Sequence, residues 1–241
     1  MDGPPSPVIL RCYVRDWVRD EPEIPFNEAL ALSLLAGHPE IPAPRLLASD
    51  PAGTVGGVPM TLMTAVSGAV VWNPSDLDGW LRGLADLAER IHRLPVSPSL
   101  SDWRPYRPED VPPPWTRYPR AWETALAAYH GPRPAADRVF LHRDFHPGNV
   151  LWTGGEITGV VDWTATCAGP PEEDIAHCRA NLARHHDLAT ADRFLRMWLA
   201  AAGRTAYDPY YDLVTVVSMV SPEVPDDGID RFVAAAAAQL R

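Results

Sequence analysis

The sequence contains no lysine, few cysteines and no long hydrophobic run. All 21 basic residues are arginine, against 31 acidic residues, and the formal net charge is −10. A chain this acidic is not expected to bind nucleic acid or an anionic membrane surface. Because lysine is missing, no lysine is available to contact a phosphate group, whereas arginine can bind one through a planar fork of donors.

The hydrophobic and cysteine patterns exclude further classes. The apolar run Phe232–Ala238 is too short to span a bilayer, and Met1–Pro4 does not resemble a signal peptide. Cys12, Cys167 and Cys178 form no disulfide framework, so we expect a reducing, cytoplasmic location. With 241 residues, 46% of them hydrophobic and 22% charged, the composition is that of a globular chain of one large domain or two lobes.

Hydrophobic periodicity predicts a short β-rich beginning and a mainly helical remainder. Strands are expected at 8–14, 45–49 and 59–64, with a helix at 26–36. The favoured hairpin turn Asp2-Gly3 precedes the first strand. Further helices are expected at 75–94, 120–129, 172–185, 191–202, 210–220 and 229–240, and a hairpin at 150–163. This order suits two lobes with a ligand cleft between them.

One segment carries the strongest chemical signal. It reads Leu141-His142-Arg143-Asp144-Phe145-His146-Pro147-Gly148-Asn149 and is followed by Val160-Val161-Asp162-Trp163. Asp144 and Asn149 share one predicted loop, and Asp162 ends an apolar strand. Phosphoryl transfer requires one carboxylate to orient a hydroxyl, together with an amide oxygen and a second carboxylate to hold Mg²⁺. The segment therefore indicates a phosphoryl-transfer site.

The pattern His142-x-Asp144-x-x-x-x-Asn149, followed by Asp162, resembles the aminoglycoside phosphotransferase family, a small-molecule branch of the protein-kinase-like fold. The resemblance covers nearly the whole chain in order. It implies an α+β, two-lobe fold. Residues 1–66 would form a truncated N-terminal β-sheet lobe with a hinge, which binds the nucleotide. Residues 67–241 would form a mainly helical C-terminal lobe for catalysis and substrate binding.

The resemblance also implies roles for single residues. Asp144 would accept or orient the proton of the substrate hydroxyl, while Asn149 and Asp162 would hold Mg²⁺. Arg11 and Glu28 would form a pair on the phosphate side of a bound ATP or GTP.

Four further assignments concern the surroundings of these residues. The linking segment, through Thr64, Ala65 and Val66, would meet the purine with backbone groups. Asp174 would steady the catalytic loop. We interpret His142 as a structural brace rather than a base, and Gly148 as a source of backbone freedom.

One departure from the family pattern concerns the N-terminus. The family normally carries two more strands before the one with Arg11, and the turn between them covers the nucleotide phosphates. Only seven residues precede Val8. Three explanations stay open: a recorded start that lies too far downstream, a short form that binds nucleotide weakly, and a non-catalytic relic. The isolated Asp2-Gly3 turn favours the first.

Three other residue groups allow more than one interpretation. The spacing of the histidines and cysteine at 142, 146, 177, 178, 185 and 186 fits no compact zinc pattern. The aromatic residues 103, 106, 115, 118 and 122 either line a substrate pocket or pack in the core. The acidic residues 208, 212, 223, 226 and 227 either attract an amine-bearing substrate or cap helices on a solvated face.

The function predicted from sequence is a kinase that moves the terminal phosphoryl group of ATP or GTP to a hydroxyl of a small molecule. An aminoglycoside-like or other amine-bearing compound is a candidate acceptor. The alternative is a non-catalytic kinase-like binding module. The sequence indicates no particular oligomeric state.

Overall fold

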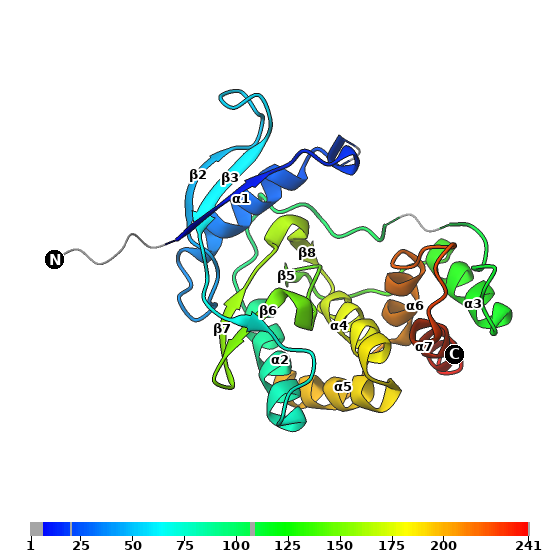
Figure 1. Cartoon of the computed structure of the whole chain (residues 1–241). Helices are drawn as coiled ribbons and strands as arrows, with labels where there is room; N and C mark the ends of the chain where they lie inside the picture. The colour runs from blue at the N-terminus through cyan, green and yellow to red at the C-terminus, as the bar shows by residue number, and fades with distance from the viewer. Residues whose placement is uncertain (1–6, 20, 107–108, 241) are drawn as a thin grey trace.

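The computed structural model describes residues 7–19, 21–106 and 109–240 of the chain. These residues form eight strands in three small antiparallel sheets, together with seven α-helices (Figure 1). The Asp2-Gly3 turn predicted from sequence lies outside the described residues. No helix within the described ranges is long and apolar enough to cross a membrane.

The first sheet lies at one end of the molecule, with α1 packed against it (Figure 1). Its strands are β1 (Val8–Cys12), β2 (Leu46–Asp50) and β3 (Met60–Thr64), in the order β1-β3-β2. Helix α1 (Ile24–Leu35) begins two residues before the predicted start because Pro25 fits the first helical turn, where its missing N–H costs nothing. A short 3₁₀ helix, η1 (Asp16–Arg19), connects β1 to α1.

The second and third sheets carry the central part of the chain. Strand β4 (Ala69–Val70) pairs with β6 (Val150–Thr153), which forms a hairpin with β7 (Glu156–Val160). Strand β5 (Val139–Leu141) pairs with β8 (Cys167–Gly169). The sequence did not indicate β8, because Cys-Ala-Gly has little strand preference and becomes a strand only through its partner.

Six helices complete the fold: α2 (Leu77–His92), α3 (Pro119–His130), α4 (Glu172–His185), α5 (Leu188–Ala202), α6 (Pro209–Val217) and α7 (Asp227–Ala237). Helix α4 lies in their midst and contacts α5, α6 and α7 (Figure 1). Helix α2 begins two residues after the predicted start at residue 75. Asp76 is the N-cap, and its carboxylate accepts the Gly79 N–H at 3.0 Å.

The two predicted functional carboxylates are anchored by aromatic neighbours in the core. Phe145 follows Asp144 directly, Trp163 follows Asp162 directly, and both rings are fully buried. Each buried ring fixes the backbone beside its carboxylate, because its apolar surface contributes roughly 2–3 kcal/mol when it leaves water. The core therefore holds both acidic positions in place while their side chains stay reachable.

Candidate active site

The motif loop, residues 141–149, and the segment around Asp162 meet through backbone and side-chain bonds. The Val161 N–H donates to the Asn149 carbonyl at 2.9 Å, which places Asp162 beside the end of the loop. The 3₁₀ turn η2 (Pro147–Asn149) leads into β6, and the β6–β7 hairpin returns the chain to Asp162. Local hairpin geometry therefore brings Asn149 and Asp162 together, as the sequence spacing predicted.

His142 ties the two acidic segments to each other. Its Nδ1 accepts the backbone N–H of Asp144 at 3.3 Å, so the ring hydrogen sits on Nε2, which donates to the Val161 carbonyl at 2.9 Å. The side chain is fully buried. Both ring nitrogens are thus engaged inside the fold, and His142 acts as a brace rather than a base.

Asp174 holds the main chain of the motif loop from helix α4. Its Oδ2 accepts the His142 N–H at 3.0 Å, and its Oδ1 accepts the Arg143 N–H at 2.6 Å. His92 of α2 lies against the same carboxylate, with Nε2 3.0 Å from Oδ2. Arg143 adopts the left-handed conformation with φ 69°, which is uncommon for a residue with a side chain. The buried Asp174 carboxylate stabilises this turn by accepting both N–H groups.

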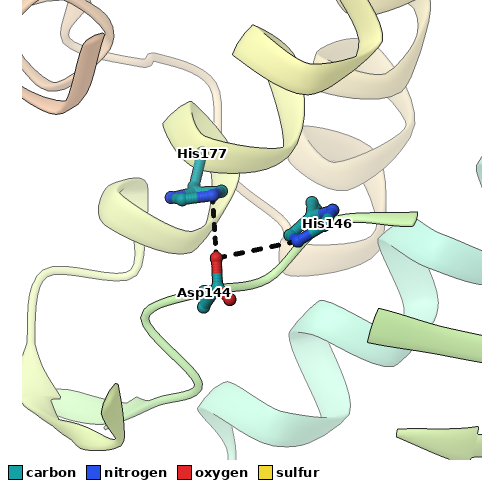
Figure 2. A group of neighbouring side chains, drawn as sticks. All are labelled: Asp144, His146 and His177. Atoms are coloured by element: carbon teal, nitrogen blue, oxygen red, sulfur yellow. Dashed lines mark ion pairs between the residues drawn. The ribbon is translucent and has the colours of Figure 1, made fainter. Parts of the chain in front are cut away.

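The Asp144 carboxylate receives hydrogen bonds from two directions. Asn149 Nδ2 donates to Oδ2 at 2.9 Å, and His177 Nε2 lies 3.0 Å from Oδ1 (Figure 2). His146 Nε2 is farther from the same oxygen, at 3.7 Å. Burial acts to raise the pKa of Asp144, but the bond and charge of His177 outweigh it and hold that pKa well below its usual range. Asp144 is therefore an ionised acceptor at neutral pH.

The Asn149 side chain is oriented so that its oxygen remains free. Its Nδ2 also donates to the Asp144 carbonyl at 2.8 Å, so both amide hydrogens are used. Within the described residues, Asn149 Oδ1 accepts no hydrogen bond. Asp162 offers a second such oxygen, because Arg11 and Thr164 both bind its Oδ1 and leave Oδ2 without a donor from the described chain. Two free oxygen ligands on adjacent segments fit the preference of Mg²⁺ for hard oxygen donors.

Arg11 joins Asp162 to Glu28. Its guanidinium nitrogen Nη1 lies 2.7 Å from Asp162 Oδ1 and 3.1 Å from Glu28 Oε1. Glu28 is buried and also accepts from the Tyr13 hydroxyl. Burial raises the pKa of Glu28 above its ordinary value, and Arg11 acts against that rise. The pair predicted between Arg11 and Glu28 is present, and it extends to Asp162, which the sequence did not indicate.

The linking segment is positioned between the first two sheets, and part of its backbone is already engaged. The Thr64 N–H donates to the Arg45 carbonyl and the Ala65 N–H to the Pro7 carbonyl, each at 3.0 Å. Val66 packs over Gly159 of β7, where a Cβ would lie 2.5 Å from a Val66 methyl group. In the described part of the chain the Val66 N–H makes no hydrogen bond. Of the three residues predicted to contact the purine, Val66 is therefore the one whose backbone N–H could donate to a ligand.

Two histidines reach Asp144 that sequence reasoning did not assign. His146 belongs to the motif loop itself, and His177 comes from α4, three residues after Asp174. The positions of both were visible in the sequence, but their meeting at Asp144 depends on how α4 packs. Burial lowers the pKa of His146 to about 4, so the ring is neutral at pH 7.

Gly148 is required for a reason different from the predicted one. Its φ is not among the positive values of the chain, so backbone freedom is not the constraint. Instead, a Cβ at this position would lie 2.5 Å from the His146 ring. The same ring accepts the Gly148 N–H on Nδ1 at 3.1 Å. Glycine is needed because the imidazole approaches its backbone closely.

Most of the acidic residues proposed as a wall for an amine serve the fold. The carboxylates of Asp208 and Asp226 cap α6 and α7. Asp212 is buried and pairs with Arg179 at 3.1 Å. Helix capping and buried pairing therefore explain these three positions without a substrate.

The aromatic residues of the 98–119 segment and α3 also differ among themselves: some pack in the core and others stay exposed. Trp103 and Trp122 are buried, and the Trp122 indole donates to Asp230 at 2.9 Å. Tyr106 is exposed and lies under the Arg143 guanidinium, 3.9 Å from ring centroid to Cζ. Packing explains the two tryptophans, whereas Tyr106 remains on the side of the motif loop that faces solvent.

Comparison with known proteins places this geometry in a family. A family model described as the phosphotransferase enzyme family (APH) matches residues 2–210. The chain belongs to this family. No curated protein sequence matches the chain closely enough to count as a relative.

Solved structures of other phosphotransferases have the same fold as this family member. The aminoglycoside phosphotransferase APH(3'')-Id from Streptomyces rimosus is 18% identical, with a TM-score of 0.64 over 94% of this chain and 86% of its own. Spectinomycin phosphotransferase APH(9)-Ia, solved with ADP and spectinomycin, is 14% identical, with a TM-score of 0.61 over 98% and 87%. The macrolide 2'-phosphotransferase MphH from Brachybacterium faecium is 18% identical, with a TM-score of 0.56 over 95% and 74%. These likenesses establish the protein-kinase-like fold predicted from the motif.

Proposed function

We propose that this phosphotransferase family member transfers the terminal phosphoryl group of ATP or GTP to a hydroxyl of a small molecule. One observation carries the proposal: an ionised Asp144, a free Asn149 oxygen and a free Asp162 oxygen are held together by the bonds of His142 and Val161. This is the set of groups that phosphoryl transfer needs, because the protein contributes mainly positioning and charge neutralisation.

In the proposed reaction, Asp144 orients the acceptor hydroxyl toward the terminal phosphorus. A bond forms between the hydroxyl oxygen and phosphorus, and the bond from phosphorus to the β–γ bridging oxygen breaks. The nucleoside diphosphate leaves with that electron pair, and the hydroxyl proton passes to Asp144. Because the pKa of Asp144 is low, its main contribution is orientation, and the proton arrives late.

Asn149 Oδ1 and Asp162 Oδ2 would hold magnesium, which when bound neutralises charge on the phosphates. Arg11 would keep its contact with Glu28 and turn its free nitrogens toward a phosphate, releasing Asp162. The purine would be met by the Val66 N–H. We also propose that residues 1–66 form a nucleotide-binding lobe and residues 67–241 a catalytic and substrate lobe. The proposed contacts of Arg11 and Val66 to the nucleotide lie in the first range, and Asn149 and Asp162 lie in the second.

We propose a broader class of phosphate-accepting substrate than the sequence suggested. Solved relatives are named for aminoglycosides, spectinomycin and a macrolide, which share hydroxyl groups. The capping and pairing of Asp208, Asp212 and Asp226 remove much of the support for an amine-selective pocket. An aminoglycoside-like compound stays one candidate among hydroxyl-bearing molecules.

A thermal-shift titration with magnesium-ATP and magnesium-GTP tests the nucleotide part, followed by a phosphoryl-transfer screen against hydroxyl compounds. A ligand bound only by the folded state adds about 2.7 kcal/mol at 100 times its Kd, so the midpoint must rise. Asp162→Asn should abolish the magnesium-dependent rise, and Asp144→Asn should keep the rise while lowering turnover by roughly 10²–10⁴-fold. Asp86→Asn, an exposed change on α2, is the matched control.

The alternative, a non-catalytic binding module, is favoured by one contact. Arg11 already neutralises Asp162 at 2.7 Å, as a site with no metal requirement would allow. That alternative predicts a midpoint that rises with a small molecule or partner but not with magnesium-nucleotide, and equal behaviour of wild type and Asp162→Asn.

A further inference from the structure

His177 takes no part in the bond-making and bond-breaking of the proposed reaction, yet it makes a direct contact with the Asp144 carboxylate. Its Nε2 lies 3.0 Å from Asp144 Oδ1, and Figure 2 shows the ring pointing from its helix at that oxygen. The side chain is 17% exposed, so solvent competes little for the bond. A histidine at this point either donates to the carboxylate, binds a metal with it, or binds substrate.

The hydrogen-bond partners of the cluster favour donation to the carboxylate over metal binding. Asp144, His146 and His177 place one ligand atom each within 4.8 Å of one another, which is the spacing of a metal site. However, the Gly148 N–H donates to His146 Nδ1, so the hydrogen of this neutral ring is on Nε2, facing Asp144. His177 Nε2 lies at hydrogen-bond distance from Asp144 Oδ1, 3.0 Å, and in such a pair the imidazole N–H donates to the carboxylate oxygen. The cluster therefore presents donors to an anion rather than lone pairs to a cation.

The place of His177 on α4 connects it to the brace of the motif loop. Asp174, three residues earlier on the same helix, accepts the N–H groups of His142 and Arg143. Residues three apart lie on one face of a helix. Helix α4 thus fixes the main chain of the loop through Asp174 and the reactive side chain through His177. Because α4 is packed on three sides by other helices, both contacts share one rigid support.

The two oxygens of Asp144 are fixed from opposite sides. Asn149 binds Oδ2 and His177 approaches Oδ1, so rotation of the carboxylate plane would break one bond or the other. A carboxylate oxygen can accept two hydrogen bonds, so Oδ2, which accepts from Asn149, keeps room for the acceptor hydroxyl, whereas both histidines approach Oδ1. The contact of His177 therefore sets the direction in which the remaining lone pair points.

We infer that His177 is a positioning residue for phosphoryl transfer, which holds the Asp144 carboxylate in the plane that receives the acceptor hydroxyl. This inference rests on the proposed function. A misplacement of about 1 Å near a reacting group can cost roughly 100-fold in rate. Loss of the His177 donor should therefore act on kcat and leave substrate affinity nearly unchanged.

The test compares His177→Leu with His177→Gln by steady-state kinetics, with the acceptor and nucleotide varied separately. His177→Leu should lower kcat on the order of 10–100-fold, with each KM changed less than about twofold. His177→Gln should restore most of kcat, because the glutamine amide nitrogen is as many bonds from Cβ as Nε2 and can donate. His130→Leu, an exposed histidine at the end of α3, is the control, and thermal midpoints show that each variant is folded.

The remaining outcomes separate this inference from the proposed function. If the wild type transfers phosphoryl groups and His177→Leu has the same kcat, the positioning role is overturned and the proposed function is not. A raised acceptor KM with unchanged kcat would make His177 a substrate-binding residue, which also overturns it. A loss that glutamine does not restore would show a packing role instead. A wild-type chain that transfers no phosphoryl group would overturn the proposed function, and this inference with it.

Discussion

The two acidic positions of the site are held in opposite ways. Asp144 is bound by the neutral amide of Asn149 and by His177, in a loop that α4 braces through buried bonds. Asp162 is bound by the full positive charge of Arg11. The Asp144 and Asp162 side chains are about equally exposed, at 36% and 38%, so the difference between them lies in their partners. The first carboxylate is fixed by geometry, and the second is neutralised by a cation that a ligand could replace.

This difference indicates which part of the site is prepared in advance. Asp174 is fully buried, so water competes little for its bonds to the motif loop, and these bonds hold the backbone beside Asp144 in one direction. The Arg11–Asp162 pair is about one-third exposed, and an ion pair that water reaches is worth little and is screened by salt. We therefore expect the acceptor side to be rigid before substrate arrives, and the nucleotide side to rearrange when magnesium-nucleotide binds.

The largest expected effect comes from removing Asp174, which holds the motif loop on the acceptor side. Asp174→Ala leaves the N–H groups of His142 and Arg143 buried without an acceptor, at about 1–3 kcal/mol for each unsatisfied group. Unfolding in urea should show a loss of roughly 3 kcal/mol or more, and turnover should fall with it. Asp192→Ala, which removes an exposed carboxylate paired with Arg179, is the comparison. Equal stability of the two variants would contradict the brace.

A smaller effect is expected on the nucleotide side, where Arg11 pairs with Asp162. Arg11→Ala removes the cation shared by Glu28 and Asp162 and should weaken magnesium-nucleotide binding by roughly tenfold, or about 1.4 kcal/mol. Arg11→Lys should weaken it less, because the ammonium keeps the charge but lacks the other guanidinium donors that would turn toward a phosphate. Isothermal titration at low and high salt measures both variants, with Arg45→Ala as control. Tighter binding in Arg11→Ala would mean that Arg11 blocks the site instead of completing it.

The smallest effect concerns pH on the rigid side. The folded pKa of His146, about 4, lies below its ordinary value of 6.5, so the unfolded chain binds more protons between these values. Stability from the neutral ring is present above pH 6.5 and is lost as pH falls toward 4. Because the ring is one-fifth exposed, water screens the charge, and we expect about 1 kcal/mol between pH 7 and 5.

The control for this pH effect is His146→Asn, whose side-chain oxygen can still accept the Gly148 N–H but does not titrate. Urea unfolding at pH 7 and pH 5 should give a smaller difference in this variant than in the wild type. Identical pH dependence of the two chains would show that His146 does not carry the effect.

Much of the secondary structure was predictable from local pattern. Helix α4 has the predicted bounds. Both ends of β1 and both ends of α1 lie within two residues of the prediction. Strand β8 was missed because its residues gain strand geometry only by pairing with β5. The start of α2 was placed two residues too early because Ser75 and Asp76 are both good N-cap residues, and the backbone decides between them.

The sequence by itself predicted which residues would carry the chemistry and that they would lie close together, because Asp144, Asn149 and Asp162 lie on one loop and one hairpin whose geometry is local. It also determined the family, since the motif and the order of elements are properties of the chain. The tertiary structure alone decided that His177 and Asp174 reach the loop from α4, that Arg11 bridges Glu28 and Asp162, and that Gly148 faces an imidazole. These contacts join residues far apart in sequence. Their existence depends on how α4, α1 and the first sheet pack, which no local pattern specifies.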